Sequence, residues 1–150
     1  MIFRMLAVCK EHAGPGVSVK DVPDVKPKEG EVLVKVKYAS ICGTDIGIYD
    51  WIPWAAARIK PPQIIGHEIL GEVIEINGSP STSSGHNIIQ TGYNVIQKGD
   101  LVSSETHIFC GECRTCKSGN PHVCENMVLF GIGRDGSFAE YATIPLKTTW

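Results

Sequence analysis

Four cysteines crowd into one short segment of the chain. Cys110, Cys113, Cys116 and Cys124 lie within fifteen residues, whereas the other two cysteines stand alone. Thiolates are preferred zinc ligands, and four of them saturate a tetrahedral Zn²⁺ ion at about 2.3 Å without leaving an open position. The spacing therefore predicts a closed, structural zinc site in a lobe at about residues 108–126.

Disulfides and an iron–sulfur cluster are two other uses of such cysteines. Disulfides need an oxidising compartment, but the opening residues have an apolar run broken by Arg4 and lack the cleavage site of a secretory signal. The first three cysteines match a ferredoxin-like spacing, but Cys124 stands at a different interval. Zinc accounts for all four thiols, and it would contribute folding free energy to a lobe with few apolar residues.

A second group of metal-binding side chains lies earlier in the chain. Cys42 follows a strand-like run, and His67 and Glu68 precede another. A thiolate, an imidazole and a carboxylate can hold a zinc ion that keeps one position open, which is a Lewis-acid site. A lone cysteine is also a common buried hydrophobe, and a His-Glu pair is common at surfaces. Spacing alone leaves both interpretations open.

Three motifs in this order resemble one family. Residues 41–45 (Ile-Cys-Gly-Thr-Asp), residues 66–72 (Gly-His-Glu-Ile-Leu-Gly-Glu) and the four-cysteine segment are similar to the amino-terminal, GroES-like domain of zinc-dependent medium-chain alcohol dehydrogenases. The likeness covers nearly the whole chain. Residues 48–62, and stretches between 105 and 141, further resemble the L-threonine 3-dehydrogenase branch of that family.

The resemblance implies a zinc-dependent oxidoreductase that uses NAD to oxidise a small-molecule alcohol. With L-threonine, zinc would polarise the hydroxyl group, the proton would be relayed away, and hydride transfer to NAD⁺ would give 2-amino-3-oxobutyrate. A sugar or polyol dehydrogenase is the nearest alternative, because pocket shape and not the zinc chooses the substrate. A non-catalytic zinc-binding fragment is the alternative from another class.

The resemblance also implies individual roles. It makes Cys42, His67 and Glu68 the ligands of a catalytic zinc, and Asp45 the carboxylate that orients the histidine. By the same resemblance Thr44 accepts the substrate proton. His107 would line the substrate pocket by this resemblance, and the alternative is a hydrogen-bonded strand histidine. Gly47 stands where the family often has a proton-relay histidine.

Short strand-like runs must position these side chains. Turn residues bound runs at 3–10, 17–22, 31–40, 69–76, 100–105 and 137–144, and a short helix is expected after Cys42. Val32, Val34 and Val36 alternate with Leu33, Lys35 and Lys37, as in a half-buried strand. The fold class expected is mainly β with minor α, a GroES-like rolled β-barrel that carries the zinc lobe. Polar, glycine-rich residues 77–91 predict an exposed loop.

Residues 1–150 are expected to form one domain, with the nucleotide-binding domain absent from this chain. The glycine pattern at 131–136 matches a dinucleotide motif by letters but opens no helical pattern, so a turn is expected there. A net charge of -2 and a pI near 6.2 exclude the basic field that nucleic acid binding needs. No run is long enough to span a membrane, and we expect a cytoplasmic protein whose complete form is a homo-oligomer.

Overall fold

The computed structural model describes residues 4–78, 88–91 and 94–150, and strands dominate it. The strands are β1 (Arg4–Lys10), β2 (Ser18–Pro23), β3 (Glu31–Ser40), β4 (Gln63–Ile64), β5 (Glu68–Asn77), β6 (Ile88–Thr91), β7 (Asn94–Gln97), β8 (Leu101–Ser103), β9 (His107–Ile108), β10 (Val128–Leu129) and β11 (Tyr141–Pro145). The helices are α1 (Gly43–Asp50), α2 (Pro53–Ala56) and α3 (Arg114–Lys117), with 3₁₀ turns at Pro121–Val123 and Leu146–Thr148. The mainly β prediction, with a helix after Cys42, is confirmed.

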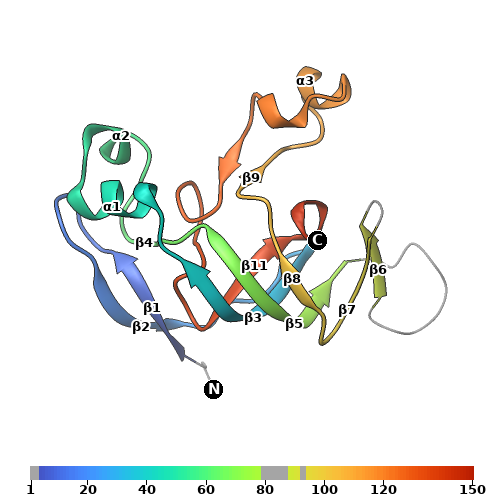
Figure 1. The fold of residues 1–150 in the computed structure, drawn as a ribbon, viewed down its shortest axis with the longest axis horizontal. Coiled ribbons are helices and arrows are strands. Elements are labelled where there is room, and N and C mark those ends of the chain that lie inside the picture. The colour runs from blue at the N-terminus through green and yellow to red at the C-terminus, as the bar shows by residue number, and fades with distance from the viewer. Residues whose placement is uncertain (1–3, 79–87, 92–93) are drawn as a thin grey trace.

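A four-stranded antiparallel sheet in the order β11-β3-β5-β8 forms the centre of the domain (Figure 1). In β3, Val32 and Val34 are fully buried while Lys35 and Lys37 are exposed, which is the alternation expected for a strand with one face on the core. These valines pack against Val73 of β5 and the other buried apolar side chains of the sheet. The predicted strand at 31–40 therefore has the predicted bounds and the predicted faces.

A second sheet, β2-β1-β4, lies beside the first, but the two do not close into one hydrogen-bonded barrel within the described part of the chain. Residues 137–140, predicted to begin the last strand, are the reason. Their backbone groups are divided among β1, β3 and the segment before β5: Val8 N donates to Phe138 O, Val36 N donates to Glu140 O, and Phe138 N donates to Ile65 O. One isolated bridge, Ala7 with Ala139, is all that replaces a ladder there. The expected barrel closure is thus corrected, and β11 begins only at Tyr141.

Part of the loop expected at 77–91 is a strand. Residues 88–91 form β6, which pairs with β7 in an antiparallel hairpin. β-Branched residues favour a strand wherever a partner supplies the hydrogen bonds, and the second strand of the hairpin supplies them here. Residues 79–87, the rest of the expected loop, lie outside the described residues.

The four-cysteine segment projects from the body of the domain and carries α3 (Figure 1). β9 and β10 pair at its base, with Ile108 opposite Val128, and so bring the two ends of the lobe together. This agrees with the lobe predicted at about residues 108–126.

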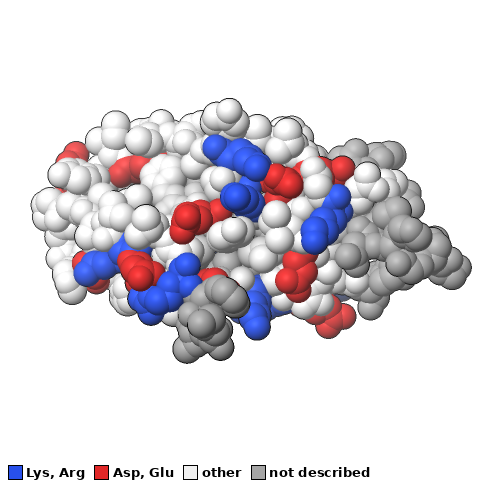
Figure 2. Space-filling model, turned by 90° about the horizontal axis from the view of Figure 1, so that it is seen from below, with Lys and Arg blue, Asp and Glu red and all other residues white. Residues whose placement is uncertain are grey.

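Charges of both signs alternate on the face seen in Figure 2, without a patch of either sign. None of the helices in the described ranges is long and apolar enough to cross a membrane.

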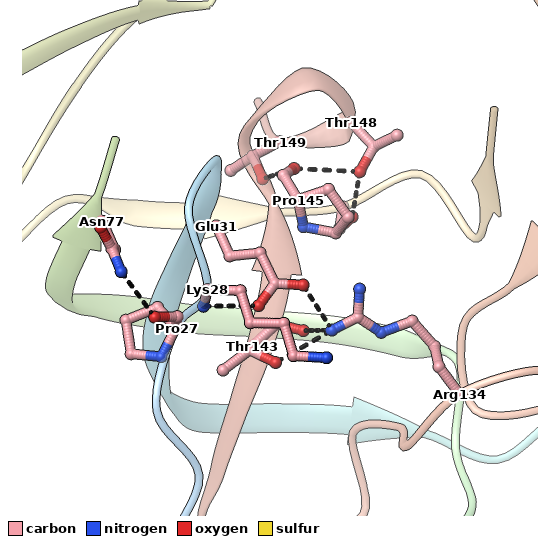
Figure 3. Close-up of polar contacts among 10 residues, drawn as sticks. Pro27, Lys28, Glu31, Asn77, Arg134, Thr143, Pro145, Thr148 and Thr149 are labelled. Carbon is pink, nitrogen blue, oxygen red and sulfur yellow. Dashed lines mark hydrogen bonds and ion pairs between the residues drawn. The ribbon is translucent and has the colours of Figure 1, made fainter. Parts of the chain in front are cut away.

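An ion pair joins the glycine-rich turn to the start of β3 (Figure 3). Arg134 Nη2 lies 2.9 Å from Glu31 Oε1 and also donates to the carbonyl and hydroxyl oxygens of Thr143 on β11. The second Glu31 oxygen accepts from the Lys28 amide at 2.9 Å. The side chains of Arg134 and Glu31 are only 26% and 11% exposed, so removing one charge would leave the other desolvated without its partner.

We therefore expect Glu31→Gln to lower the free energy of unfolding by about 2 kcal/mol. The matched control is Glu72→Gln, which breaks the 2.7 Å pair with Lys37, whose members are each more than a third exposed. That control should cost less than about 1 kcal/mol. Denaturant unfolding measures both variants, and equal losses would contradict the role given to the Arg134 pair.

Candidate metal centres

The four predicted lobe cysteines converge on one point. Their sulfur atoms all lie within 4.8 Å of one another, and the closest contacts are 3.5 Å between Cys110 and Cys124, 3.8 Å between Cys113 and Cys124, and 4.0 Å between Cys110 and Cys116. A tetrahedron with zinc–sulfur bonds of about 2.3 Å has edges of about 3.8 Å. All six cysteines of the chain are free thiols, so the disulfide alternative finds no support. The donor set fits a closed zinc site.

Backbone amides and a hydroxyl group point at these sulfurs. The hydroxyl of Thr115, 3.1 Å from Cys113 Sγ, is the main cause that lowers the pKa of Cys113 to about 5. The amides of Glu112 and Cys113 lower the pKa of Cys110, whereas burial raises the pKa of Cys116 to about 12. Thiolates this close repel one another, and a divalent cation removes that repulsion.

The second candidate centre depends on the register between β3 and β5. Ser40, the last residue of β3, pairs with Glu68, the first residue of β5. Cys42 and His67 lie just beyond these two strand ends, and their Sγ and Nε2 atoms are 3.0 Å apart. Two donors from segments 25 residues apart therefore meet at the ends of the two inner strands of the central sheet.

Cys42 is also the N-cap of α1. Its sulfur accepts from the Thr44 amide at 3.3 Å. The Cys42 sulfur also accepts from the Asp45 backbone, and the Asp45 carboxylate accepts from the Cys42 amide at 3.0 Å, and this reciprocal pair is a capping box. Burial raises the pKa of Cys42, but hydrogen bonds from Thr44 and the nearby His67 outweigh it, so the pKa is lowered overall. The helix start thus favours a thiolate.

Asp45 stands behind the imidazole. Its Oδ1 atom lies 3.5 Å from His67 Nδ1, and neither of these two buried atoms has a hydrogen-bond partner among the described residues. The contact is therefore an ion pair that turns Nε2 towards Cys42. Asp45 is the main cause that raises the pKa of His67 to about 9, against the opposing effect of burial, and Cys42 adds to it.

The other predicted site residues lie apart from this group. Among the described residues the second metal-binding cluster is Cys42, Asp45 and His67, and it does not include Glu68, which is exposed. His107 is 57% exposed, pairs with Glu105 at 3.0 Å, and lines a separate cleft of about 320 Å³. The Glu68 carboxylate and the His107 imidazole therefore lie at the surface and not in the cluster.

Gly47, where a relay histidine was expected by resemblance, is buried in α1. A Cβ atom there would lie 3.0 Å from Ile52 Cδ1, so a larger side chain would require Ile52 to move. Trp51 and Trp54 pack on the apolar cluster around Ile48, which supports core packing as their role.

The glycine pattern at 131–136 also has a packing role. A Cβ atom on Gly131 or on Gly136 would come within 2.0 Å of the Gly66 carbonyl oxygen, so both positions require close backbone contact. No helix begins there among the described residues, as the sequence predicted. The glycines support the segment that ends at His67.

Residues 28–150 match the family described as alcohol dehydrogenase GroES-like domain. The chain belongs to this family. L-threonine 3-dehydrogenase from Pyrococcus horikoshii is 48% identical over the whole chain, and the enzyme of the same name from Caldanaerobacter subterraneus is 47% identical over 97% of it. The chain spans only 39% and 38% of these relatives' lengths.

Solved structures of alcohol dehydrogenases share this fold. A cobalt- and zinc-bound alcohol dehydrogenase from Pyrobaculum aerophilum superposes with a TM-score of 0.76 at 29% identity, over 98% of this chain and 41% of that one. An Escherichia coli alcohol dehydrogenase complexed with NADH gives a TM-score of 0.76 at 32% identity, over 98% and 38%. The GroES-like fold and the relation to alcohol and threonine dehydrogenases that the sequence predicted are confirmed.

Three hydroxyl groups that sequence reasoning missed contact the backbone of this GroES-like domain at the second centre. They donate to consecutive carbonyl oxygens at 67, 68 and 69, and the donors are Thr106, Ser137 and Ser103. Each donor is at least 34 residues from its acceptor. No local pattern in the sequence could have shown these contacts.

The lobe generates a prediction about metal content. We expect about one tightly held zinc per chain after mild chelation, and Cys113→Ser should abolish its retention because a structural site needs all four sulfurs. Elemental analysis and proteolysis of residues 108–126 measure the two effects. Cys9→Ala, at a buried cysteine outside the lobe, is the control and should keep the zinc. A metal-free lobe that stays folded would refute the structural assignment.

The second centre generates a pH prediction for the metal-free protein. The pKa of His67 is raised from 6.5 to about 9, so its contribution to stability is complete below pH 6.5 and is lost as the pH rises through about 9. Asp45→Asn removes the main cause of the raised His67 pKa. The fall in stability between pH 6.5 and pH 9 should therefore be shallower in this variant than in the unaltered protein. Denaturant midpoints between pH 6 and pH 9.5, in chelator, give the comparison. Parallel curves for the two proteins would show that Asp45 does not hold the proton on His67.

Proposed function

We propose that this chain is the zinc-binding catalytic domain of an NAD-dependent L-threonine 3-dehydrogenase. The observation that carries the catalytic role is the contact between Cys42 Sγ and His67 Nε2 at 3.0 Å, with Asp45 behind the imidazole. Relatives of that name, 41–48% identical over nearly the whole chain, support threonine as the substrate.

The Cys42 thiolate and the Nε2 atom of the His67 imidazole, 3.0 Å apart, are donors that suit a zinc ion. Cys42 and His67 would hold it, and Glu68 remains a proposed additional ligand from the neighbouring strand position. Zinc in such a site supplies a Lewis acid that lowers the pKa of an alcohol hydroxyl group. Asp45 keeps Nε2 of His67 directed at the site and fixes its tautomer.

Thr44 is the proposed acceptor of the substrate proton. It is half-buried, it follows Cys42 by two residues, and its amide already donates to the Cys42 sulfur. Its hydroxyl group is therefore held on the same helix turn as the proposed metal ligand. His107, which lines the cleft beside the lobe, is proposed to contact the rest of the substrate.

We place the NAD-binding domain outside residues 1–150. Within the described residues no glycine turn leads from a strand into a helix of the kind that holds a pyrophosphate. NAD would accept the hydride from the substrate carbon. Residues 1–150 alone should therefore neither bind NAD⁺ nor oxidise threonine.

The deciding experiment assays the protein at its full encoded length. Purified, zinc-loaded protein is incubated with NAD⁺ and, in parallel, L-threonine, a pentose sugar and a polyol, with NADH formation as the readout. Preference for threonine supports the proposal. Faster turnover of the sugar or polyol would assign the site to a different alcohol, and zinc binding without any turnover would indicate a non-catalytic zinc-binding module.

Thr44 gives a sharper test in the same protein. Thr44→Ala should lower kcat by roughly 10²–10⁴-fold, the range for one positioned acid–base group, without loss of zinc. Thr44→Ser keeps the hydroxyl group and should retain most of the activity. Steady-state kinetics with zinc analysis measure both. Full activity in Thr44→Ala, with zinc present, would remove Thr44 from the proton path.

A further inference from the structure

Residues 64–69 lead into β5, and each backbone carbonyl in this segment accepts a hydrogen bond from an identified donor. The first three accept from backbone amides, of Gly136, Phe138 and Ser137 in turn. The next three accept from side-chain hydroxyl groups. We call Ser103, Thr106 and Ser137 the hydroxyl clamp.

The clamp draws its members from separate parts of the chain. Ser103 ends β8, Thr106 lies between β8 and β9, and Ser137 lies in the segment before β11. Their hydroxyl oxygens are 2.8, 3.0 and 3.0 Å from the carbonyl oxygens of Ile69, His67 and Glu68, respectively. Side-chain donors on three consecutive carbonyls fix that backbone more tightly than one sheet partner would.

Thr106 is the member that acts on His67 itself. His67 is 7% exposed, and the Thr106 hydroxyl is the donor that the described residues supply to its carbonyl. The Thr106 carbonyl in turn accepts from the Phe130 amide at 3.0 Å, so the hydroxyl group is itself held in place. A buried carbonyl without a donor is unfavourable, and the peptide would turn to find another one.

The position of the His67 peptide group determines where the His67 imidazole lies. The ring has Cys42 Sγ at 3.0 Å on one nitrogen and Asp45 at 3.5 Å on the other, which leaves little freedom for a shifted backbone. Gly131 and Gly136 press on the neighbouring carbonyl of Gly66, so the segment cannot move in that direction either.

We propose that the Thr106 hydroxyl group, the member of the hydroxyl clamp that donates to the His67 carbonyl, holds His67 in the geometry for metal binding with Cys42. The inference rests on the proposed metal site at Cys42 and His67. Thr106 contacts the backbone of His67 and is not a member of the metal-binding cluster, so it is a positioning residue.

The test measures metal affinity in the protein at its full encoded length. After mild chelation that leaves the lobe zinc in place, Co²⁺ or Zn²⁺ is titrated into the unaltered protein and Thr106→Val, which has the same shape but no hydroxyl group. We expect the dissociation constant at the Cys42 site to rise about 10-fold or more in Thr106→Val, the range for partners that orient metal ligands. The Co²⁺ absorption bands should shift as the ligand geometry relaxes.

Thr106→Ser is the conservative variant, and it should restore both the affinity and the spectrum. Ser103→Ala is the matched control, because it removes a clamp hydroxyl whose acceptor, Ile69, is no ligand. The dissociation constant for metal at the Cys42 site should change less than about twofold in Ser103→Ala. Lobe zinc content reports whether each variant is folded.

The outcomes separate the inference from the function it rests on. If the unaltered protein binds no Co²⁺ or Zn²⁺ beyond the lobe zinc, or still binds that metal after Cys42→Ser, the proposed site itself is wrong. If it binds that metal and Thr106→Val matches it in affinity and spectrum, or Thr106→Ser fails to restore binding in a folded protein, the clamp inference is overturned alone.

Discussion

The pairing of β3 with β5 is the constraint on which the second centre depends. Because Ser40 lies opposite Glu68, the residues just past these strand ends are brought together, and Cys42 meets His67. A slip of one residue would exchange the two faces of the strand and expose Val32 and Val34, which are fully buried. The hydrophobic pattern of β3 therefore fixes the register, and the register fixes the distance between the two donors.

The same residues serve helix α1 and the candidate metal centre. Cys42 caps the helix and Asp45 completes the capping box, so the local need to satisfy free amides already directs the Asp45 carboxylate to this point. His67, the residue before β5, places its imidazole between these two side chains. The helix start, the thiolate and the histidine proton are thus physically coupled, which is why Asp45 raises the pKa of His67.

The two centres differ in the range of their contacts. The lobe takes four sulfurs from one continuous segment, joined at its base by β9 and β10, and four sulfurs leave a metal no open position. The second centre takes its donors from two segments and offers fewer of them, so a further group can approach. One closed site and one open site in the same domain suit a division between structural support and chemistry.

The sequence by itself determined the elements and the local sites. Strand alternation in 31–40, the helix after Cys42 and the four-cysteine spacing are short-range patterns, and each agrees with the structure. Tertiary structure alone decided the rest. It divided the backbone of 137–140 among three other segments, paired 88–91 into a hairpin, and left Glu68 outside the cluster. It also brought the Thr106 hydroxyl to His67, because a hydrogen bond between residues 39 apart leaves no periodic trace in the chain.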